Sequence, residues 1–157
     1  MRIYIMRHGE AQNFAPSDAE RPLTVCGEAH SKQMAFQLAS QLSDGIDLVW
    51  VSPYLRAQQT WSVMAKHLPQ PKRLMTVDEI TPYGDAEDVA AYLKAMIAVE
   101  RPESVLLVSH LPLVGYLTSE LAPGLQPPMF RTSAIAAVEY FPDSEQAEFL
   151  WQANPEG

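Results

Sequence analysis

Short runs of apolar residues alternate along the chain with longer segments in which apolar positions recur every three or four residues. The short runs contain no polar alternation, which is typical of strands buried on both faces of a parallel sheet. The longer segments each carry one apolar stripe, as Met34 and Leu38 do, and this spacing predicts amphipathic helices. The predicted strands are residues 3–6, 48–51, 74–77 and 104–108, and the predicted helices are residues 24–42, 55–67, 86–100 and 112–121.

The end of the chain follows a different pattern. Residues 134–141 and 147–151 are strand-like and flank Pro142-Asp143, which predicts a closing β-hairpin. Strands and helices alternate before it, so we expect an α/β fold, a three-layer α/β/α sandwich around a mainly parallel sheet, with the hairpin as an antiparallel edge. The length of 157 residues suits a single domain over residues 1–157.

The composition of the chain argues against some classes of binding partner. The chain is 47% apolar and 19% charged, with a net charge of −8 and a pI of about 4.9, which argues against a nucleic-acid surface. The single cysteine, Cys26, excludes an internal disulfide and fits a reducing cytoplasm. No stretch approaches the roughly 20 apolar residues that span a bilayer. We therefore expect a cytoplasmic protein without a nucleic-acid or membrane partner.

Polar side chains follow three of the predicted strands at the point where each strand ends. Arg7, His8 and Gly9 follow the first strand, Arg56 lies in the first turn of the helix after the second, and His110 follows the strand at 104–108. The carboxyl ends of parallel strands meet at one edge of a sheet, where ligands bind. We expect these side chains to lie together, and Gly9 to let the backbone turn sharply and an anion approach closely.

Arg21, in the polar loop after the first strand, would extend the same cluster. An acidic protein that gathers three guanidiniums and two imidazoles at one place needs an anion there, because the cations would otherwise repel one another. A tetrahedral phosphate dianion or a related oxyanion matches guanidinium groups best. The alternative is that Arg21 is an ordinary surface residue, with Asp18 or Glu20 as a neighbour.

The residue types predict phosphoryl chemistry. A neutral imidazole is a good nucleophile toward phosphorus, and a phosphorylated imidazole is easily hydrolysed. His8 is the better candidate nucleophile because Arg7 and Gly9 flank it, and His110 would donate a hydrogen bond to a phosphoryl oxygen. No metal-ligand spacing is visible, so we expect no metal or cofactor, and arginines with a protonated histidine to neutralise the phosphoryl charge.

Three blocks of sequence resemble the motifs of the histidine phosphatase superfamily, whose fold is phosphoglycerate mutase-like. They are Arg7-His8-Gly9, the segment SPYLRAQQT at residues 52–60, and Ser109-His110. Within that superfamily the chain is similar to the small phosphohistidine phosphatases of bacterial phosphorelays. That similarity rests on RPLT at residues 21–24, LPLVGYL at 111–117 and PPMF at 127–130, and it spans essentially the whole chain.

The resemblance implies a role for each candidate residue. His8 would be the phosphorylated nucleophile, Arg7, Arg56 and His110 would form the phosphate pocket, and Arg21 would extend it. The implied substrate is a phosphohistidine on a histidine-containing phosphotransfer domain or a related phosphocarrier protein. The connections are short, so the site should be an open groove that admits a protein side chain.

Glu79 lies near the place where mutase-type relatives keep an acidic residue, and it is either a catalytic acid or a solvated loop carboxylate. Two other functions remain open on the sequence. A phosphomonoesterase for a small metabolite or a phospho-Ser/Thr protein would share the pocket but need a working acid. A protein that binds a phosphorylated partner without cleaving it would need only the cations. The loop at residues 127–130 is either a plain connection or part of the groove's rim.

Overall fold

The structure is a computed structural model that describes all residues, 1–157. Six strands form one sheet in the order β3-β2-β4-β1-β5-β6. The strands are β1 (Arg2–Arg7), β2 (Leu48–Val51), β3 (Arg73–Thr76), β4 (Ser104–Ser109), β5 (Ile135–Phe141) and β6 (Gln146–Ala153). The four strands β1, β2, β3 and β4 are parallel to one another. β5 pairs antiparallel with β1, and β6 pairs antiparallel with β5 at the edge of the sheet. The predicted mainly parallel sheet with an antiparallel hairpin is confirmed.

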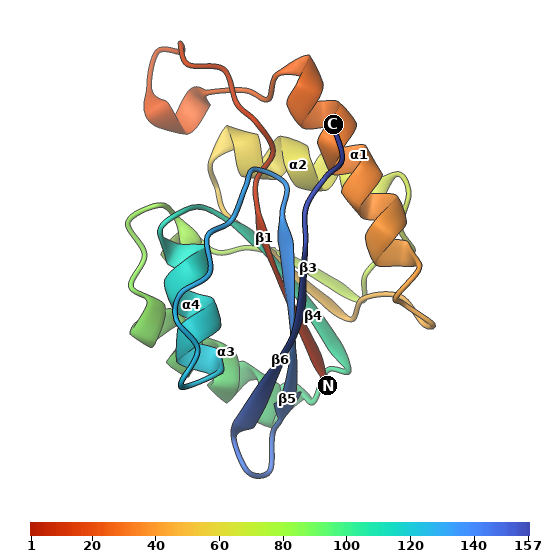
Figure 1. Ribbon diagram of the computed structural model, residues 1–157, viewed down its shortest axis with the longest axis vertical. Coiled ribbons are helices and arrows are strands. Elements are labelled where there is room, and N and C mark those ends of the chain that lie inside the picture. Colours follow the sequence, from red (N-terminus) through yellow and green to blue (C-terminus); the bar gives the residue numbers. More distant parts are fainter.

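Helices cover both faces of this sheet, so the predicted three layers are confirmed (Figure 1). The helices are α1 (Val25–Ala39), α2 (Leu55–Ala65), α3 (Ala86–Glu100) and α4 (Leu113–Leu121), with short 3₁₀ helices η1 (Asp18–Glu20) and η2 (Asp78–Ile80) in two loops. α1 and α2 pack on one face, and α3 and α4 pack on the other.

The two hydrophobic cores are made by alternate residues of the same strands. In β1, Ile3 and Ile5 face the core beneath α3 and α4, whereas Tyr4 and Met6 face the core beneath α1 and α2. All four side chains are at most 1% exposed. A strand covered on both sides has no polar face, which is why the central strands read as unbroken apolar runs.

Helix ends differ from the prediction by up to three residues. The hydroxyl of Thr24 caps α1 by accepting a hydrogen bond from the amide of Gly27 at 3.0 Å, as expected. The helix ends at Ala39 and not at residue 42, because the amides of Gln41 and Leu42 bond to carbonyls only three residues back, in a tightened turn.

The other two differences are small. α2 ends at Ala65 instead of residue 67, and the amide of His67 bonds to the carbonyl of Met64 in a terminal turn. α4 begins at Leu113, so Pro112 lies just before the helix and not in its first turn.

Gly9 has a different role from the expected one. A Cβ on Gly9 would lie 2.8 Å from the Ser31 hydroxyl oxygen and 2.9 Å from the Gly27 carbonyl oxygen, both in α1. Its φ is not positive, so no left-handed backbone requires glycine there. The missing side chain lets α1 pack directly against the turn that follows β1, and this contact holds the backbone beside His8.

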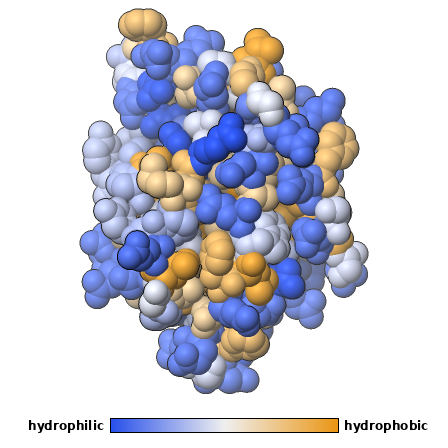
Figure 2. Space-filling view, viewed as in Figure 1, coloured by the Kyte–Doolittle hydropathy of each residue, from blue (hydrophilic) through white to orange (hydrophobic).

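The face drawn in Figure 2 is mainly hydrophilic, with apolar residues dispersed in small groups. No helix of the structure has both the length and the apolar character needed to cross a membrane.

Candidate active site

The strand order brings the predicted residues together. β2, β4 and β1 are neighbours in the sheet, and their carboxyl ends point toward the top of Figure 1, where the η1 loop lies. The backbone amide of His8 donates to the carbonyl of Ser109 at 2.9 Å, which ties the end of β1 to the end of β4. As a result, the ring centroids of His8 and His110 lie 5.0 Å apart, at 55° to each other.

The two ring nitrogens of His8 have different roles. Nδ1 lies 2.7 Å from the carbonyl oxygen of Gly9, which can only accept, so Nδ1 carries the hydrogen. In the neutral ring Nε2 then keeps its lone pair, and Nε of Arg56 donates to it at 3.3 Å. The residue is 7% exposed. Nε2 is therefore the atom of this ring that is able to attack phosphorus.

Arg56 is held in place from several sides. It lies in the first turn of α2, is 4% exposed, and its guanidinium carbon sits 5.0 Å from the centroid of the Tyr54 ring. The hydroxyl of Thr60, one helical turn later, donates to the carbonyl of Arg56 at 2.7 Å and accepts from the amide of Gly9 at 2.9 Å. Thr60 therefore joins the helix that carries Arg56 to the turn that carries His8.

His110 is fixed by residues of the segment at 52–60. Its Nε2 lies 2.7 Å from the Ser52 hydroxyl, and the Tyr54 ring meets the imidazole edge-on, with centroids 5.0 Å apart. Its Nδ1 is buried and has no hydrogen-bond partner in the protein. A buried polar atom without a partner is costly, so this nitrogen is suited to a ligand atom.

One nitrogen of the Arg7 guanidinium has a hydrogen-bond partner in the protein, and another has none. Nη1 donates to the carbonyl of Phe130 at 2.9 Å, so the loop at 127–130 touches the site directly. Nε is buried and has no partner. Nε of Arg7 and Nδ1 of His110 are therefore two unpartnered polar atoms on residues next to His8, one adjacent in the chain and one adjacent in space, which is a pattern expected where an oxyanion binds.

Arg21 reaches the cluster through an acidic residue. Its Nη1 pairs with Oδ1 of Asp18 at 2.8 Å, and Nη2 of Arg56 pairs with Oδ2 of the same carboxylate at 3.2 Å. The neighbour of Arg21 is therefore Asp18, whereas Glu20 bonds to Ser17. The side chain of Arg21 is 27% exposed, so it sits at the mouth of the cluster.

Glu79 is not joined to the cluster. It lies in η2, its side chain is exposed, and no hydrogen bond or ion pair connects it with another residue. η2 itself is anchored near the site, because the hydroxyl of Ser109 donates to the carbonyl of Ile80 at 2.7 Å. Glu79 therefore lies near the carboxyl end of β4, but no contact holds its carboxylate toward His8 or His110.

Both imidazoles are neutral at neutral pH. Burial is the main cause that lowers the pKa of His8 to about 4, and the positive charges of Arg56, Arg7 and Arg21 lower it further. Burial also lowers the pKa of His110 to about 2, assisted by His8 and the nearby arginines. The expected protonated histidine is therefore wrong for the free protein, because an added cation would sit desolvated among guanidiniums. A neutral ring still donates one N–H.

Three further residues shape the site, and the sequence predicted no role for them. Ser52, Tyr54 and Thr60 contact His110 or Arg56, and all three lie within the segment at 52–60, in which a role was predicted for Arg56 alone. Thr60 stands four residues after Arg56, a spacing that places both on one face of a helix. That spacing was the available signal.

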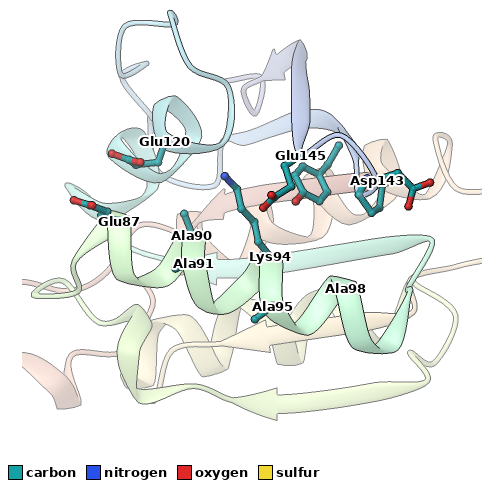
Figure 3. Close-up of a pocket in the computed structure, with 11 residues that line it drawn as sticks. Glu87, Ala90, Ala91, Lys94, Ala95, Ala98, Glu120, Asp143 and Glu145 are labelled. Carbon is teal, nitrogen blue, oxygen red and sulfur yellow. The ribbon is translucent and has the colours of Figure 1, made fainter.

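A separate surface hollow lies away from this cluster. It measures about 590 Å³, and Lys94 rises from α3 between Glu120 and Glu145 on its wall (Figure 3). Glu87 and Asp143 line it as well, so carboxylates outnumber the one ammonium and would repel a phosphoryl dianion. A smaller hollow of about 350 Å³ is lined by Asn13, Ala15, Ser17, Asp18 and Arg21, and it lies at the mouth of the histidine and arginine cluster.

No group of three or more His, Cys, Asp or Glu side chains is placed so that it could hold a metal ion.

Comparison with known proteins agrees with this geometry. The model of the histidine phosphatase superfamily (branch 1) matches residues 3–88. Phosphohistidine phosphatase SixA of Escherichia coli K12 is 48% identical over 155 residues, covering 99% of this chain and 94% of the relative. The SixA homolog of Haemophilus influenzae is 40% identical over 165 residues, covering 99% and 97%.

A solved structure of SixA complexed with tungstate superposes with a TM-score of 0.92 at 48% identity, covering 99% of this chain and 97% of that chain. The fold and the sequence thus agree over nearly the full length, and the resemblance in the three sequence blocks is confirmed. The chain belongs to the histidine phosphatase superfamily, branch 1.

Proposed function

We propose that this protein is a phosphohistidine phosphatase, a hydrolase that removes phosphate from a phosphohistidine of a partner protein through a covalent intermediate on His8. The observation that carries the proposal is the arrangement of His8, whose Nδ1–H is bound to the Gly9 carbonyl and whose Nε2 lone pair faces the guanidinium of Arg56. The relatives named phosphohistidine phosphatases support the same activity.

In the first step Nε2 of His8 attacks phosphorus while the bond from phosphorus to the substrate's imidazole nitrogen breaks. The electron pair of that bond goes to the leaving nitrogen, and the leaving imidazole is neutral if its other nitrogen is protonated. Arg7, Arg56 and Nδ1 of His110 would bind the phosphoryl oxygens and neutralise their charge as the group transfers. Arg21 would contribute its charge from the mouth.

In the second step a water oxygen attacks phosphorus of the phospho-His8, and the bond to Nε2 breaks. The proton of the attacking water passes to a phosphoryl oxygen, so it leaves with the inorganic phosphate, and the lone pair returns to Nε2. Phosphoimidazoles hydrolyse readily, so positioning and charge neutralisation supply most of what this step needs. Because the pKa of His8 is lowered to about 4, the ring is neutral at neutral pH and the nucleophile is available.

The position of Glu79 favours this substrate over a phosphate ester. An alkoxide leaving group requires a positioned acid, whereas an imidazole leaves without one. Glu79 is exposed and is not held toward the cluster, so the site lacks a fixed acid at that point. The partner would be a histidine-containing phosphotransfer domain or a phosphocarrier protein, whose phosphohistidine would enter between Arg21 and the loop at 127–130.

The test uses a phosphotransfer domain that carries phosphohistidine. The wild-type protein should shorten the phosphohistidine lifetime equally with and without a metal chelator. Under single-turnover conditions an alkali-stable, acid-labile phosphoryl group should appear on His8 by mass spectrometry. His8→Ala should lose roughly a thousandfold or more of the rate, as expected when a nucleophile is removed.

His30→Ala is the matched control, since His30 lies in α1 and its side chain has a hydrogen bond with Cys26 alone. It should retain the wild-type rate. An unchanged phosphohistidine lifetime with the wild-type protein, or a phosphoryl group found on another residue, would rule the proposal out.

A further inference from the structure

Asp18 places an anion among the pocket cations. Its two carboxylate oxygens accept from Nη1 of Arg21 at 2.8 Å and from Nη2 of Arg56 at 3.2 Å. Its backbone carbonyl also accepts from Nη1 of Arg56, at 2.7 Å. Asp18 lies in η1, which has no buried residue, so packing of the core does not explain these contacts. The contacts instead couple a surface loop to the two guanidiniums.

The carboxylate changes the charge of the pocket. The hydrogen bond from Arg21 is the main cause that lowers the pKa of Asp18, and Arg56 lowers it further, so the group is ionised at neutral pH. The two imidazoles are neutral. Three guanidiniums and one carboxylate therefore leave a formal charge of +2, equal and opposite to that of a phosphoryl dianion. Without Asp18 the pocket would carry +3.

We infer that Asp18 is a charge-setting residue that weakens the hold of the pocket on inorganic phosphate and so permits product release. This inference rests on the proposed function. The carboxylate repels a bound dianion and competes with it for N–H groups of Arg56 and Arg21. A phosphatase that retained its product would be inhibited by it, and binding the ground state more tightly does not increase turnover.

A purely structural role for Asp18 predicts the opposite sign. If the carboxylate only held Arg21 and Arg56 in position, its removal would loosen both side chains and weaken oxyanion binding. The direction of the change in affinity therefore separates the two roles.

Asp18→Asn removes the charge and keeps an acceptor oxygen of the same size. Calorimetric titration with inorganic phosphate and with tungstate, at fixed pH and ionic strength, should give Kd values roughly tenfold lower than for the wild-type protein, as removal of one nearby like charge predicts. With a phosphorylated phosphotransfer domain as substrate, KM and the inhibition constant of phosphate should fall and kcat should not rise. Unchanged or weaker oxyanion binding would overturn the inference.

Glu20→Gln is the matched control, because Glu20 lies two residues away in η1 and bonds only to Ser17. It removes the same charge from the same loop and should leave the Kd within about twofold of the wild-type value. An equal effect of both variants would overturn the inference, because net charge alone would then explain it.

Asp18→Ala provides a second variant with the same expected sign, and circular dichroism verifies that each variant is folded. The binding titrations use no phosphohistidine. A wild-type protein that bound oxyanions but failed to cleave phosphohistidine would therefore refute the proposed function and leave the effect of Asp18 measurable.

Discussion

Ser52 favours one tautomer of His110. The Ser52 hydroxyl oxygen accepts from the amide of Tyr54 at 3.2 Å, and the other hydrogen-bond partner of this hydroxyl is Nε2 of His110, at 2.7 Å, so donation of the hydroxyl hydrogen to Nε2 satisfies both groups. In the neutral ring the hydrogen then resides on Nδ1, the atom that has no partner in the protein. Ser52 thus makes the buried nitrogen of His110 a donor, which is what a phosphoryl oxygen requires.

Ser52→Ala should therefore lower kcat/KM for phosphohistidine by roughly tenfold or more, because the ring can then place its hydrogen on either nitrogen. Stopped-flow or quench kinetics on the phosphotransfer domain measures the loss. The control is Ser104→Ala, another buried serine, whose hydroxyl bonds to the carbonyl of Gly45 at the opposite end of β4. Activity of Ser52→Ala equal to that of Ser104→Ala would contradict this account of His110.

At the scale of elements, the features that the sequence predicted best are those set by neighbouring residues in the chain, namely the bounds of helices and the buried strands. The bounds of α3, Ala86–Glu100, and the apolar core of β1 and β4 agree with the prediction. Because parallel strands end at one edge, the meeting of His8 and His110 could also be predicted. The ends of the predicted strands are therefore sufficient to locate the candidate site.

Contacts between segments that are far apart in the chain could not be predicted from the sequence. The partner of Gly9 is α1, more than a dozen residues later, and nothing local distinguishes that contact from a flexible turn. The link from Asp18 to Arg56 joins an irregular loop to a helix 38 residues later. The exposed setting of Glu79 likewise depends on how η2 sits on the sheet. The neutral state of both imidazoles, in place of one neutral and one protonated ring, depends on burial, which the sequence does not give.

The contact between α1 and the turn after β1 leads to a prediction. A Cβ on Gly27 would lie 2.1 Å from the carbonyl oxygen of Glu10, so backbone must move to admit it. Gly27→Ala should lower the free energy of unfolding by about 1–3 kcal/mol, the usual cost of overpacking. It should also reduce kcat/KM, because the displaced turn carries the carbonyl of Gly9 that orients His8. Urea unfolding and phosphatase assays measure both effects.

Lys32→Ala, at an exposed position of α1, serves as the comparison and should change stability by less than about 0.5 kcal/mol. If Gly27→Ala matched it in both stability and activity, the packing of α1 would have no bearing on the position of His8.

At the scale of the whole molecule, the two buried imidazoles link stability to pH. The pKa values of His8 and His110 are lowered to about 4 and about 2 in the folded chain, and both return to about 6.5 on unfolding. Below pH 6.5 the unfolded chain therefore binds up to two more protons than the folded chain. Stability is full above pH 6.5 and falls as the pH falls toward 4.

Urea unfolding between pH 7.5 and pH 5 should show this loss, since the carboxylates of Asp18 and Glu139, whose pKa values are also lowered, titrate only in more acidic solution. His8→Asn should reduce the slope by up to one proton, about 1.4 kcal/mol per pH unit. Ser104→Ala, which removes no titratable group, should keep the wild-type slope. A stability independent of pH across this range would mean that the imidazoles are not buried as neutral groups, and the availability of the His8 lone pair would lose its basis.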